Sequence, residues 1–236
     1  MDLRKNYLRD VPLEHCIKRG TAVVLEESDT GLFLWDNLGW VYMLVNDNYD
    51  EAVSWLKKHE EREYDLMTIY RDDLARFINE RYGLNIGMEC YQGAWLHDKA
   101  PAMKGLLDIK HADMNDLSFI LENYAHGHEE WMREVIKEKL LYIACDESGN
   151  RVGFGGQHLE GSIGMIQILP EFRNKGYAAE MESFMIDKIM KEGFTPYGQV
   201  FSDNEASMAL QRKMGFEFWE GTLCWMYKHE DESDYS

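Results

Sequence analysis

The sequence predicts an α/β protein in which helices pack on a mixed central sheet. Strand-like and helix-like patterns alternate in both halves of the 236 residues. Hydrophobic residues make up 45% of the chain and aromatic residues 13%, which is enough to build a core and argues against disorder. In the helical pattern at 177–192, apolar residues recur at spacings of three and four, as a single buried face requires.

The chain divides into two blocks near residues 97–105. Pro101 and Gly105 interrupt the periodic pattern there, as such residues do in connecting segments. We therefore expect an N-terminal α/β domain over 1–104 and a second domain over 105–236, which ends in the acidic tail HEDESDYS.

The first block alternates strands with helices. Its expected elements are strands at 21–26, 31–35 and 40–45, a helix at 49–59, a strand at 65–70, a helix at 72–82 and a strand at 88–96. Gly83 follows the second helix, where a glycine can adopt the left-handed conformation that ends helices.

The second block begins with helices. Its expected elements are helices at 113–122 and 129–139, strands at 140–145, 151–159 and 163–169, a helix at 177–192, a strand at 197–201, a short helix up to 214 and a last pair of strands in 216–219 and 222–228. Gly193 and Gly215 stand just after the two later helices, again where glycine stops a helix.

The order of elements in the first block resembles that of the strand–helix–strand–helix–strand part of the second. The first block is either a degenerate repeat of the second or a coincidental match, since α/β patterns recur widely. Its strand-to-helix junction, VNDNYDE at 45–51, carries Asp47, Asp50 and Glu51 but no cation or glycine, so it would repel an anion.

Charge and composition exclude several classes of function. A net charge of −18 argues against a nucleic-acid binder, which needs a cationic face, and favours a cationic small partner. The most apolar stretch, 30–45, is interrupted by Asp36 and Asn37, so no membrane span is expected. The charged start of the chain has no apolar run typical of a secretory signal. Four scattered cysteines without C-x-x-C spacing fit reduced thiols, and we expect a cytoplasmic protein.

The junction LPEFRNKGYA at 169–178 has the features of an anion site. A helix N-terminus presents amide N–H groups without intrahelical partners at the positive end of the helix dipole. Gly176 lets the backbone approach a phosphate closely, and Arg173 and Lys175 add positive charge. The alternative is an ordinary strand–turn–helix connection with surface cations. Neither a P-loop nor a G-x-G-x-x-G pattern is present here.

The same junction resembles a known family. RNKGYA at 173–178 matches the [RQ]-x-x-G-x-[GA] signature of the GCN5-related N-acetyltransferases, the GNAT superfamily. IQILPEF at 166–172 resembles the family's fourth strand and the turn after it, and NEASMALQRKMGF at 204–216 resembles its Asn-led helix. LPEFR and GFTPYGQV are similar to the glycine N-acyltransferase-like branch, whose members carry an extra N-terminal domain. The resemblance covers residues 105–228.

The resemblance implies a GNAT fold that holds acetyl-CoA between strands 163–169 and 197–201. The pantetheine arm would bind the main chain of Ile166 and Ile168, with Asn204 and Ser207 on the neighbouring helix. The pyrophosphate would lie on the amides of the junction, that is on Arg173, Asn174, Lys175, Gly176, Tyr177 and Ala178.

The catalytic groups are less evident from the sequence. Many family members place a tyrosine acid seven residues after the helix-leading Asn, and this chain has Gln211, which cannot deliver a proton at neutral pH. The candidates around the second and third strands are Glu160, at a hairpin end where exposure is expected, His158 and Gln167. In the glycine N-acyltransferase-like branch the glutamate proposed as base matches about Ser162, two residues later.

The stretch AHGHEEWM at 125–132 clusters two histidines with two glutamates. An H-x-H pair on a loop without further converging ligands is weak evidence for a metal, so no metal is expected. In the family this region borders the acceptor pocket, which makes His126, His128 and Trp131 candidate acceptor contacts, although Trp131 can equally be a core residue.

These features together predict an N-acyltransferase that transfers an acetyl group from acetyl-CoA to a primary amine of a small molecule or amino acid. The missing tyrosine leaves a second possibility, a non-catalytic CoA-binding regulator. We expect a monomer or homodimer that binds neither nucleic acid nor membrane.

Overall fold

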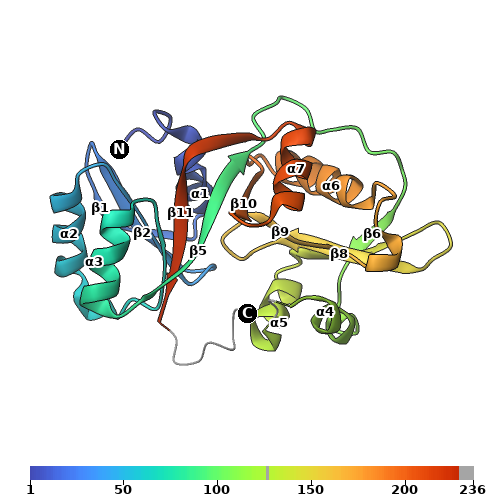
Figure 1. Ribbon diagram of the computed structural model, residues 1–236, viewed down its shortest axis with the longest axis horizontal. Helices are drawn as coiled ribbons and strands as arrows, with labels where there is room; N and C mark the ends of the chain where they lie inside the picture. Colours follow the sequence, from blue (N-terminus) through green and yellow to red (C-terminus); the bar gives the residue numbers. More distant parts are fainter. Residues whose placement is uncertain (126–127, 229–236) are drawn as a thin grey trace.

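The computed structural model describes residues 1–125 and 128–228 (Figure 1). The elements of the first half are α1 (Tyr7–Arg19), β1 (Ala22–Glu27), β2 (Gly31–Asp36), β3 (Val41–Asn46), α2 (Tyr49–Lys58), the 3₁₀ turn η1 (Glu60–Arg62), β4 (Leu66–Ile69), α3 (Asp72–Tyr82) and β5 (Asn85–Ala94). Gly83 ends α3 in the left-handed conformation, with φ of 72°, as its position in the sequence predicts.

The second half begins with a short strand. Its elements are β6 (Asp108–His111), α4 (Leu117–Asn123), α5 (Glu129–Lys137), β7 (Leu141–Cys145), β8 (Arg151–Gln157), β9 (Ile163–Ile168), the 3₁₀ turn η2 (Pro170–Phe172), α6 (Tyr177–Lys191), β10 (Tyr197–Phe201), α7 (Glu205–Met214) and β11 (Glu217–Tyr227).

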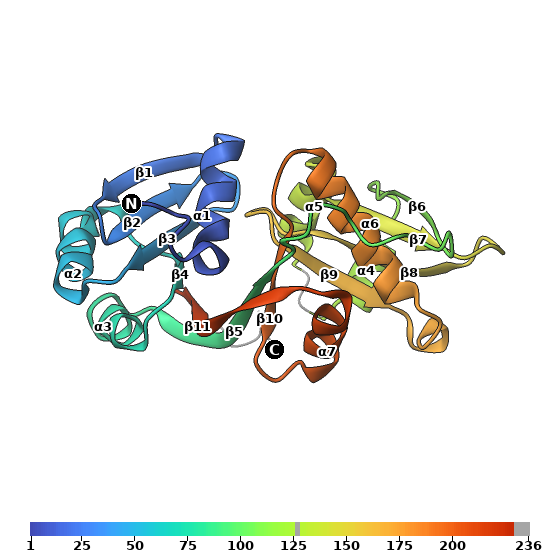
Figure 2. The same cartoon turned by 90° about the horizontal axis from the view of Figure 1, so that it is seen from above.

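All eleven strands of the described residues belong to one sheet, in the order β1-β2-β3-β4-β11-β5-β10-β9-β8-β7-β6. Two neighbouring pairs are parallel, β3 with β4 and β9 with β10, and the other pairs are antiparallel. Helices α2 and α3 pack together on the first half, whereas α4 and α5 lie on the opposite side of the second half from α6 and α7 (Figures 1 and 2). The expected mixed sheet with helices packed on it is confirmed.

The two halves share the order of their central elements. The series β3–α2–β4–α3–β5 matches the series β9–α6–β10–α7–β11, and in each the first two strands are parallel. Each series ends in a strand at least ten residues long.

These two long strands are exchanged between the halves. β5 of the first half lies between β11 and β10, whereas β11 of the second half lies between β4 and β5. Figure 2 shows both strands crossing the middle of the molecule. Each half therefore depends on a strand from the other to satisfy the hydrogen-bonding edges of its own strands.

Helix α1 makes hydrogen bonds to the second half. The sequence patterns do not reveal this helix. Tyr7 Oη lies 2.6 Å from Thr195 Oγ1, Lys18 Nζ donates to Gly193 O, and Arg19 Nη1 donates to Leu159 O over 2.8 Å. Because the helix contacts structure on several sides, charged residues such as Arg9 and Asp10 are buried along with apolar ones. It therefore lacks the apolar stripe by which a surface helix is recognised.

Pro12 lies inside α1 and removes one backbone donor. In a regular helix the amide of residue 12 would bond Leu8 O, and proline has no N–H to give. Gln92 on β5 replaces it, since its Nε2 donates to Leu8 O over 2.6 Å and to Arg9 O over 2.8 Å. These two hydrogen bonds connect α1 to β5, one of the two strands exchanged between the halves.

The end of the second half differs from the expected pair of strands. Residues 217–227 form the single strand β11, whose pairing with β5 shifts register between Phe218 and Thr222. The irregularity contains Gly221, which in the sequence is typical of a break between two strands. In the structure the strand continues through it with a bend. Strand β6 was also not expected, and no helix of the described residues is both long and apolar enough to span a membrane.

Candidate functional site

Strands β9 and β10 meet at a single point. Ile163 and Gly198 are their one registered pair, whereas β3 and β4 are paired through three residues, beginning with Tyr42 and Met67. We call this region, residues 163–168 and 198–201, the fork. Because backbone donors and acceptors need partners, the edges that face each other beyond the pair are open to a ligand that offers amide groups.

Strand β9 contains a bulge just beyond that pair. Its pairing with β8 shifts register between Gly156 and Phe154, and Met165 adopts a left-handed φ of 57°. A Cβ on the opposing Gly155 would lie 3.0 Å from Ile166 Cγ1, so the glycine makes room for the extra residue. A bulge bends a strand and interrupts its ladder, and here the interruption of the pairing with β8 falls at Met165 and Ile166.

The junction at 169–178 has the geometry of an anion site. The amides of residues 174 to 179 donate to no other group of the described chain, and intrahelical bonding begins with the bond from Glu180 N to Gly176 O. Asn174 and Gly176 have positive φ angles of 62° and 87°. Successive amides in such a turn point to one side and form a concave donor surface.

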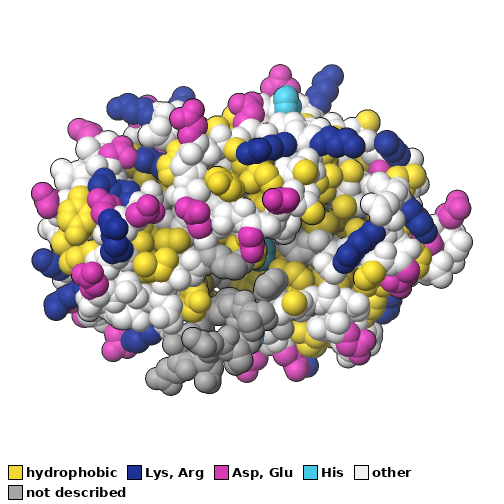
Figure 3. All heavy atoms as spheres, in the orientation of Figure 1, with side chains coloured by type: hydrophobic (Ala, Val, Ile, Leu, Met, Phe, Trp, Pro, Cys, Tyr) yellow, Lys and Arg dark blue, Asp and Glu magenta, His cyan; other side chains and the backbone are white. Residues whose placement is uncertain are grey.

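Positive charge is available at this junction. Arg173, Asn174 and Lys175 are exposed, and Lys175 Nζ lies 5.1 Å from the centre of the Phe172 ring. Tyr177 and Ala178 are half-buried in the first turn of α6. On the face drawn in Figure 3, Lys and Arg side chains line the upper edge, over α6 and α7.

Glu180 anchors the connection between the halves to this helix end. Its carboxylate accepts hydrogen bonds from the amides of Lys104, Gly105 and Leu106, at 2.8, 2.7 and 3.0 Å. A Cβ on Gly176 would meet only Leu106 Cδ1, at 3.5 Å. The connection therefore packs beside the junction and leaves the exposed side of Gly176 open.

Two predicted pantetheine contacts already have protein partners. Ile168 O accepts from Arg173 Nε over 3.1 Å, so a ligand amide there would replace this bond. Asn204 caps α7, where its Oδ1 accepts from Ser207 N over 3.0 Å. Asn204 and Ser207 still lie beside β10, since α7 follows that strand directly.

The fold brings His158 and Trp131 together at the fork. Their ring centres are 5.5 Å apart, and a Cβ on Gly164 would overlap the His158 ring. Gly164 directly follows the paired Ile163, so His158 lies against the first open residue of β9. His128 is the N-cap residue of α5, the helix that carries Trp131, and His126 lies outside the described residues.

Glu160 is buried, contrary to the exposure expected at a hairpin end. It is 6% exposed, and the backbone of Gly39 in the first half packs against it. Ser162 Oγ donates to Glu160 Oε1, and Tyr197 Oη donates to Glu160 O over 3.0 Å. The sequence did not reveal this burial because the covering loop is more than a hundred residues away.

Both a family model and solved structures resemble this chain. Residues 140–226 match the family model described as FR47-like protein, and no curated protein sequence matches the chain. Among solved structures, a Drosophila protein is 14% identical with a TM-score of 0.67, covering 84% of this chain and 74% of its own.

Two further structures extend over nearly all of the chain. A GCN5-related N-acetyltransferase from Kribbella flavida is 10% identical with a TM-score of 0.57, covering 98% of both chains. A tandem GNAT protein from the clavulanic acid biosynthesis pathway is 11% identical with a TM-score of 0.51, covering 93% of this chain and 87% of its own. The fold is that of the GNAT acetyltransferases.

Within this GNAT fold, Gln211 lies on the helix side of the fork. It is 5% exposed, and its Nε2 lies 3.0 Å from the position that a Cβ on Gly198 would take. Glu182 of α6, which the sequence analysis did not select, is 2% exposed and hydrogen-bonds with Gln211. A charged residue next to Met181 in the apolar stripe of that helix was the signal that could have identified it.

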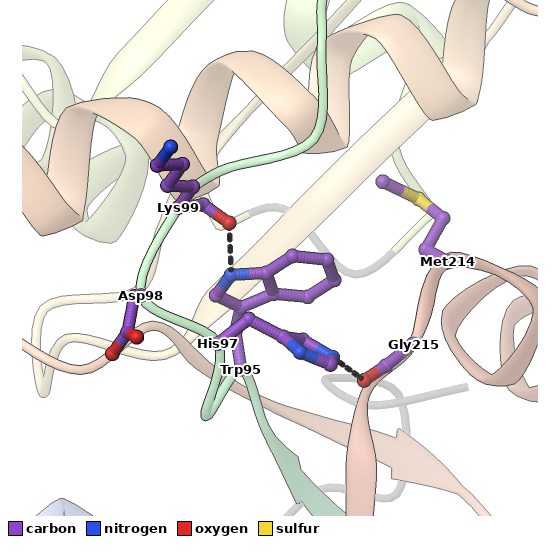
Figure 4. A pocket seen from close by; sticks show the side chains of 6 residues that line it. All are labelled: Trp95, His97, Asp98, Lys99, Met214 and Gly215. Carbon is purple, nitrogen blue, oxygen red and sulfur yellow. Dashed lines mark hydrogen bonds between the residues drawn. The ribbon is translucent and has the colours of Figure 1, made fainter.

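A second surface feature lies apart from the fork. Figure 4 shows a hollow beside the end of α7, where Trp95 Nε1 donates to Lys99 O over 3.1 Å and His97 Nε2 lies 3.1 Å from Gly215 O. Neither α6 nor β9 contributes to its lining. Across 1–125 and 128–228, no three His, Cys, Asp or Glu side chains are arranged to hold a metal ion.

Proposed function

We propose that this protein is an N-acyltransferase that moves an acetyl group from acetyl-CoA to a primary amine of a small molecule or amino acid. The observation that carries the proposal is the fork at Ile163 and Gly198, which opens beside the unpartnered amides of residues 174–179. The FR47-like match and the GNAT-fold neighbours support acyl transfer as the class of reaction.

The free groups of the site fit the chemistry of CoA. The pyrophosphate would accept from the amides of 174–178, with Arg173 and Lys175 supplying charge. The pantetheine arm, a linear chain with two amides, would bond the open edge of β9 at Ile166 and Ile168 and pass Asn204 and Ser207. Protein groups would thus replace the water molecules that hydrate the pyrophosphate and the pantetheine amides of free CoA.

The reaction needs a base and a stabilised leaving group. The amine nitrogen attacks the thioester carbon, a base takes the amine proton, and the C–S bond breaks, so that its electron pair leaves with sulfur, which later takes up a proton. His158 is the better-placed base because its ring lies against Gly164, whereas Glu160 is engaged by Ser162. A main-chain N–H near the bulge at Met165 would stabilise the oxyanion.

The acceptor would approach from the side of His158 and Trp131, which lies opposite α6 and α7. An aromatic ring beside an imidazole suits a small amine, since an ammonium group is attracted to ring faces and to the net charge of −18. His128 would border this approach, and the proposed contact through His126 falls outside the described residues. We further propose a cytoplasmic monomer or homodimer without nucleic-acid or membrane partners.

The first half, in this proposal, is a degenerate GNAT-like repeat without a CoA site, as in the glycine N-acyltransferase-like branch with its extra N-terminal domain. The matching element order and the strand exchange support the repeat. Its helix start is already occupied, because Asn48 accepts from Glu51 N and Asp47 pairs with Arg9 over 2.6 Å. Its parallel strands β3 and β4 are also paired through three residues, whereas β9 and β10 are paired through one.

The test is release of CoA thiol from acetyl-CoA in the presence of a panel of amines and amino acids, alongside calorimetric titration with CoA. Amine-dependent release together with CoA binding is the expected result. Tight CoA binding without release under any amine would identify a CoA-binding regulator instead. Absence of CoA binding would overturn both.

A further inference from the structure

A series of side-chain hydrogen bonds reaches the fork from both exchanged strands. Gln92 on β5 is fully buried, and its Oε1 accepts from Gln199 Nε2 on β10 over 3.1 Å. Gln199 Oε1 in turn accepts from Trp225 Nε1 on β11 over 2.8 Å. The amide of Gln199, a residue of the fork, is therefore held by one side chain from each of the two strands that cross between the halves.

The orientation of this amide follows from the chemistry of its partners. Gln92 Nε2 donates to the main-chain oxygens of Leu8 and Arg9, which can only accept, so Gln92 must offer its oxygen to β10. An indole N–H can only donate, so Gln199 must offer its oxygen to Trp225 and its nitrogen to Gln92. A flipped Gln199 amide would lose both hydrogen bonds, and one orientation is therefore fixed.

Gln199 lies on the face of β10 that points away from α7. Side chains alternate between the two faces along a strand. Gly198 faces Gln211 of α7, whereas the Tyr197 ring lies on the other face, with its centre 5.6 Å from that of His15 on α1. Gln199 is two residues after Tyr197 and shares its face.

Strand β9 presents His158 on the matching face. Ile163 packs in the core cluster that α6 covers, and the next residue, Gly164, faces the opposite way, toward the His158 ring. Because Ile163 pairs with Gly198, Gly164 and Gln199 are the first residues of the two strands beyond that pair. The imidazole and the fixed amide thus flank the point where the strands separate, on the side opposite α6 and α7.

The Gln199 amide can bind one more partner. A primary amide has two N–H donors, and Gln92 takes one of them. No hydrogen bond within residues 1–125 and 128–228 uses the second N–H. The side chain is half-buried, which leaves part of it accessible. A fixed donor at the opening of the fork suits a ligand that brings an oxygen acceptor.

We propose that Gln199 selects the acceptor by donating this N–H to a carbonyl oxygen next to the attacking amine, with Gln92 and Trp225 as positioning residues. The inference rests on the proposed function and narrows its acceptor to amines that carry a neighbouring carboxylate or amide group. Such a molecule would place its nitrogen near His158 and its carbonyl oxygen on Gln199. An amine without that oxygen would leave the donor unpaired, which is how a polar site discriminates.

The test compares three acceptors that share one carbon skeleton, namely an amino acid, its amide and the amine that lacks the carboxyl group. Alanine, alaninamide and ethylamine form one set, and phenylalanine, phenylalaninamide and phenethylamine form another. The selectivity ratio is the kcat/KM of the acid or the amide divided by that of the plain amine. We expect Gln199→Met to lower this ratio about tenfold for the acid, the amide or both, which also tells a carboxylate from a neutral carbonyl.

The intrinsic basicity of each amine cancels when the ratio is compared between two proteins. A selectivity ratio that is equal in the unmodified protein and in Gln199→Met, for both the acid and the amide, would overturn the proposal. Circular dichroism shows whether the variant is folded.

Trp225→Phe tests the positioning role, because it keeps an aromatic ring and removes the donor that holds Gln199 Oε1. It should lower the selectivity ratio about threefold, a change that a loss of stability alone would not cause. Trp35→Phe is the matched control, since Trp35 Nε1 donates to Asn37 Oδ1 over 2.9 Å in the first half, away from β10. Equal ratios in these two variants would show that Trp225 does not position Gln199.

Nuclear magnetic resonance separates this inference from the proposed function. The side-chain amide signals of Gln199, identified by their loss in Gln199→Met, should shift when the acid or the amide is added to the unmodified protein with CoA, and not with the plain amine. If the signals shift but no acceptor elicits thiol release, the acceptor site stands and acyl transfer fails. If thiol is released and the signals do not shift, acyl transfer stands and the role of Gln199 fails.

Discussion

Gly198 and Ile163 form the one registered pair between the parallel strands β10 and β9 of the described chain. In the first half the equivalent strands β3 and β4 stay paired over three residues. The difference leaves the open edge of β9 beside the helix end at Gly176 in the second half alone. Geometry, and not residue chemistry alone, therefore distinguishes the two halves.

Gly176→Glu should abolish measurable CoA binding. The position is open and beside the free amides, so a carboxylate there would occupy the anion site and repel phosphate, at a cost of at least about 2 kcal/mol or ~30-fold in affinity. Gly176→Ala is the matched control, because it carries the same backbone strain at φ of 87° without the charge. Calorimetric titration with CoA, with circular dichroism to monitor folding, measures both. Equal affinities for the two variants would contradict the anion site.

Glu180→Ala should destabilise the protein by at least about 2 kcal/mol in urea unfolding, because three amides of residues 104–106 lose a charged acceptor. The exposed Glu192, which pairs with Lys188 at the surface, gives the control variant Glu192→Ala, expected within about 1 kcal/mol of the unmodified protein. CoA affinity should fall only in Glu180→Ala, since Leu106 packs beside Gly176. Equal stabilities of the two variants would show that the connection is held by other contacts.

The exchanged strands predict that neither half folds alone. A fragment of residues 105–236 lacks β5, which lies between β10 and β11, and a fragment of 1–104 lacks β11, which lies between β4 and β5. Each fragment should give circular dichroism of a largely unfolded chain, and mixing the two should restore structure and CoA binding. A 105–236 fragment that folds cooperatively and binds CoA with full affinity would show that the exchange is dispensable.

His15 should make stability depend on pH in mild acid. Burial lowers the pKa of this imidazole to about 3, with smaller effects from Arg19, Lys18 and Lys188, and its Nδ1 has no partner. Its folded pKa is depressed below the ordinary value of ~6.5, so the unfolded chain takes up a proton that the folded state refuses as pH falls below that value. The free energy of unfolding should then drop by about 1.4 kcal/mol per pH unit from this group.

The variant His15→Phe isolates this contribution. Phenylalanine keeps the stacking on Phe194, whose ring centre lies 4.4 Å from that of His15, but cannot be protonated. The difference in unfolding free energy between the unmodified protein and the variant should change by about 1.4 kcal/mol per pH unit between about pH 6 and about pH 4. A difference that stays constant, or one that the exposed-site control His97→Gln reproduces, would contradict it.

Local patterns predict the elements whose environment is local. The strand expected at 163–169 and the helix expected at 177–192 correspond to β9 and α6, because alternation and three–four spacing follow from facing one core. Helix α1 was missed because Pro12 and several buried charges blur its pattern, and its partners, such as Gln92, are distant in the sequence. The exchange of β5 and β11 is a pairing between residues over a hundred apart, which no local pattern reports.

The site divides in the same way. The junction at 173–178 was visible in the sequence because a helix start, a glycine and two cations are adjacent, and the residue roles assigned to it stay predictions. The burial of Glu160 depends on Gly39 of the first half, and Gln211 contacts Gly198 and Glu182 on two other elements, so neither environment follows from a local pattern. His158 and Trp131, which the sequence analysis selected for separate roles, lie with ring centres 5.5 Å apart, and those roles stay predictions.

Hydrogen exchange on addition of CoA tests the central claim most directly. The amides of residues 174–178 and of the open strand around Ile166 should exchange more slowly in the complex, because they have no partner or an open edge in the free protein. The exchange rates of the amides at 46–51, the equivalent segment of the first half, should not change when CoA is added. Protection confined to the hollow near Trp95 and Gly215, or to the first half, would contradict a CoA site at the fork.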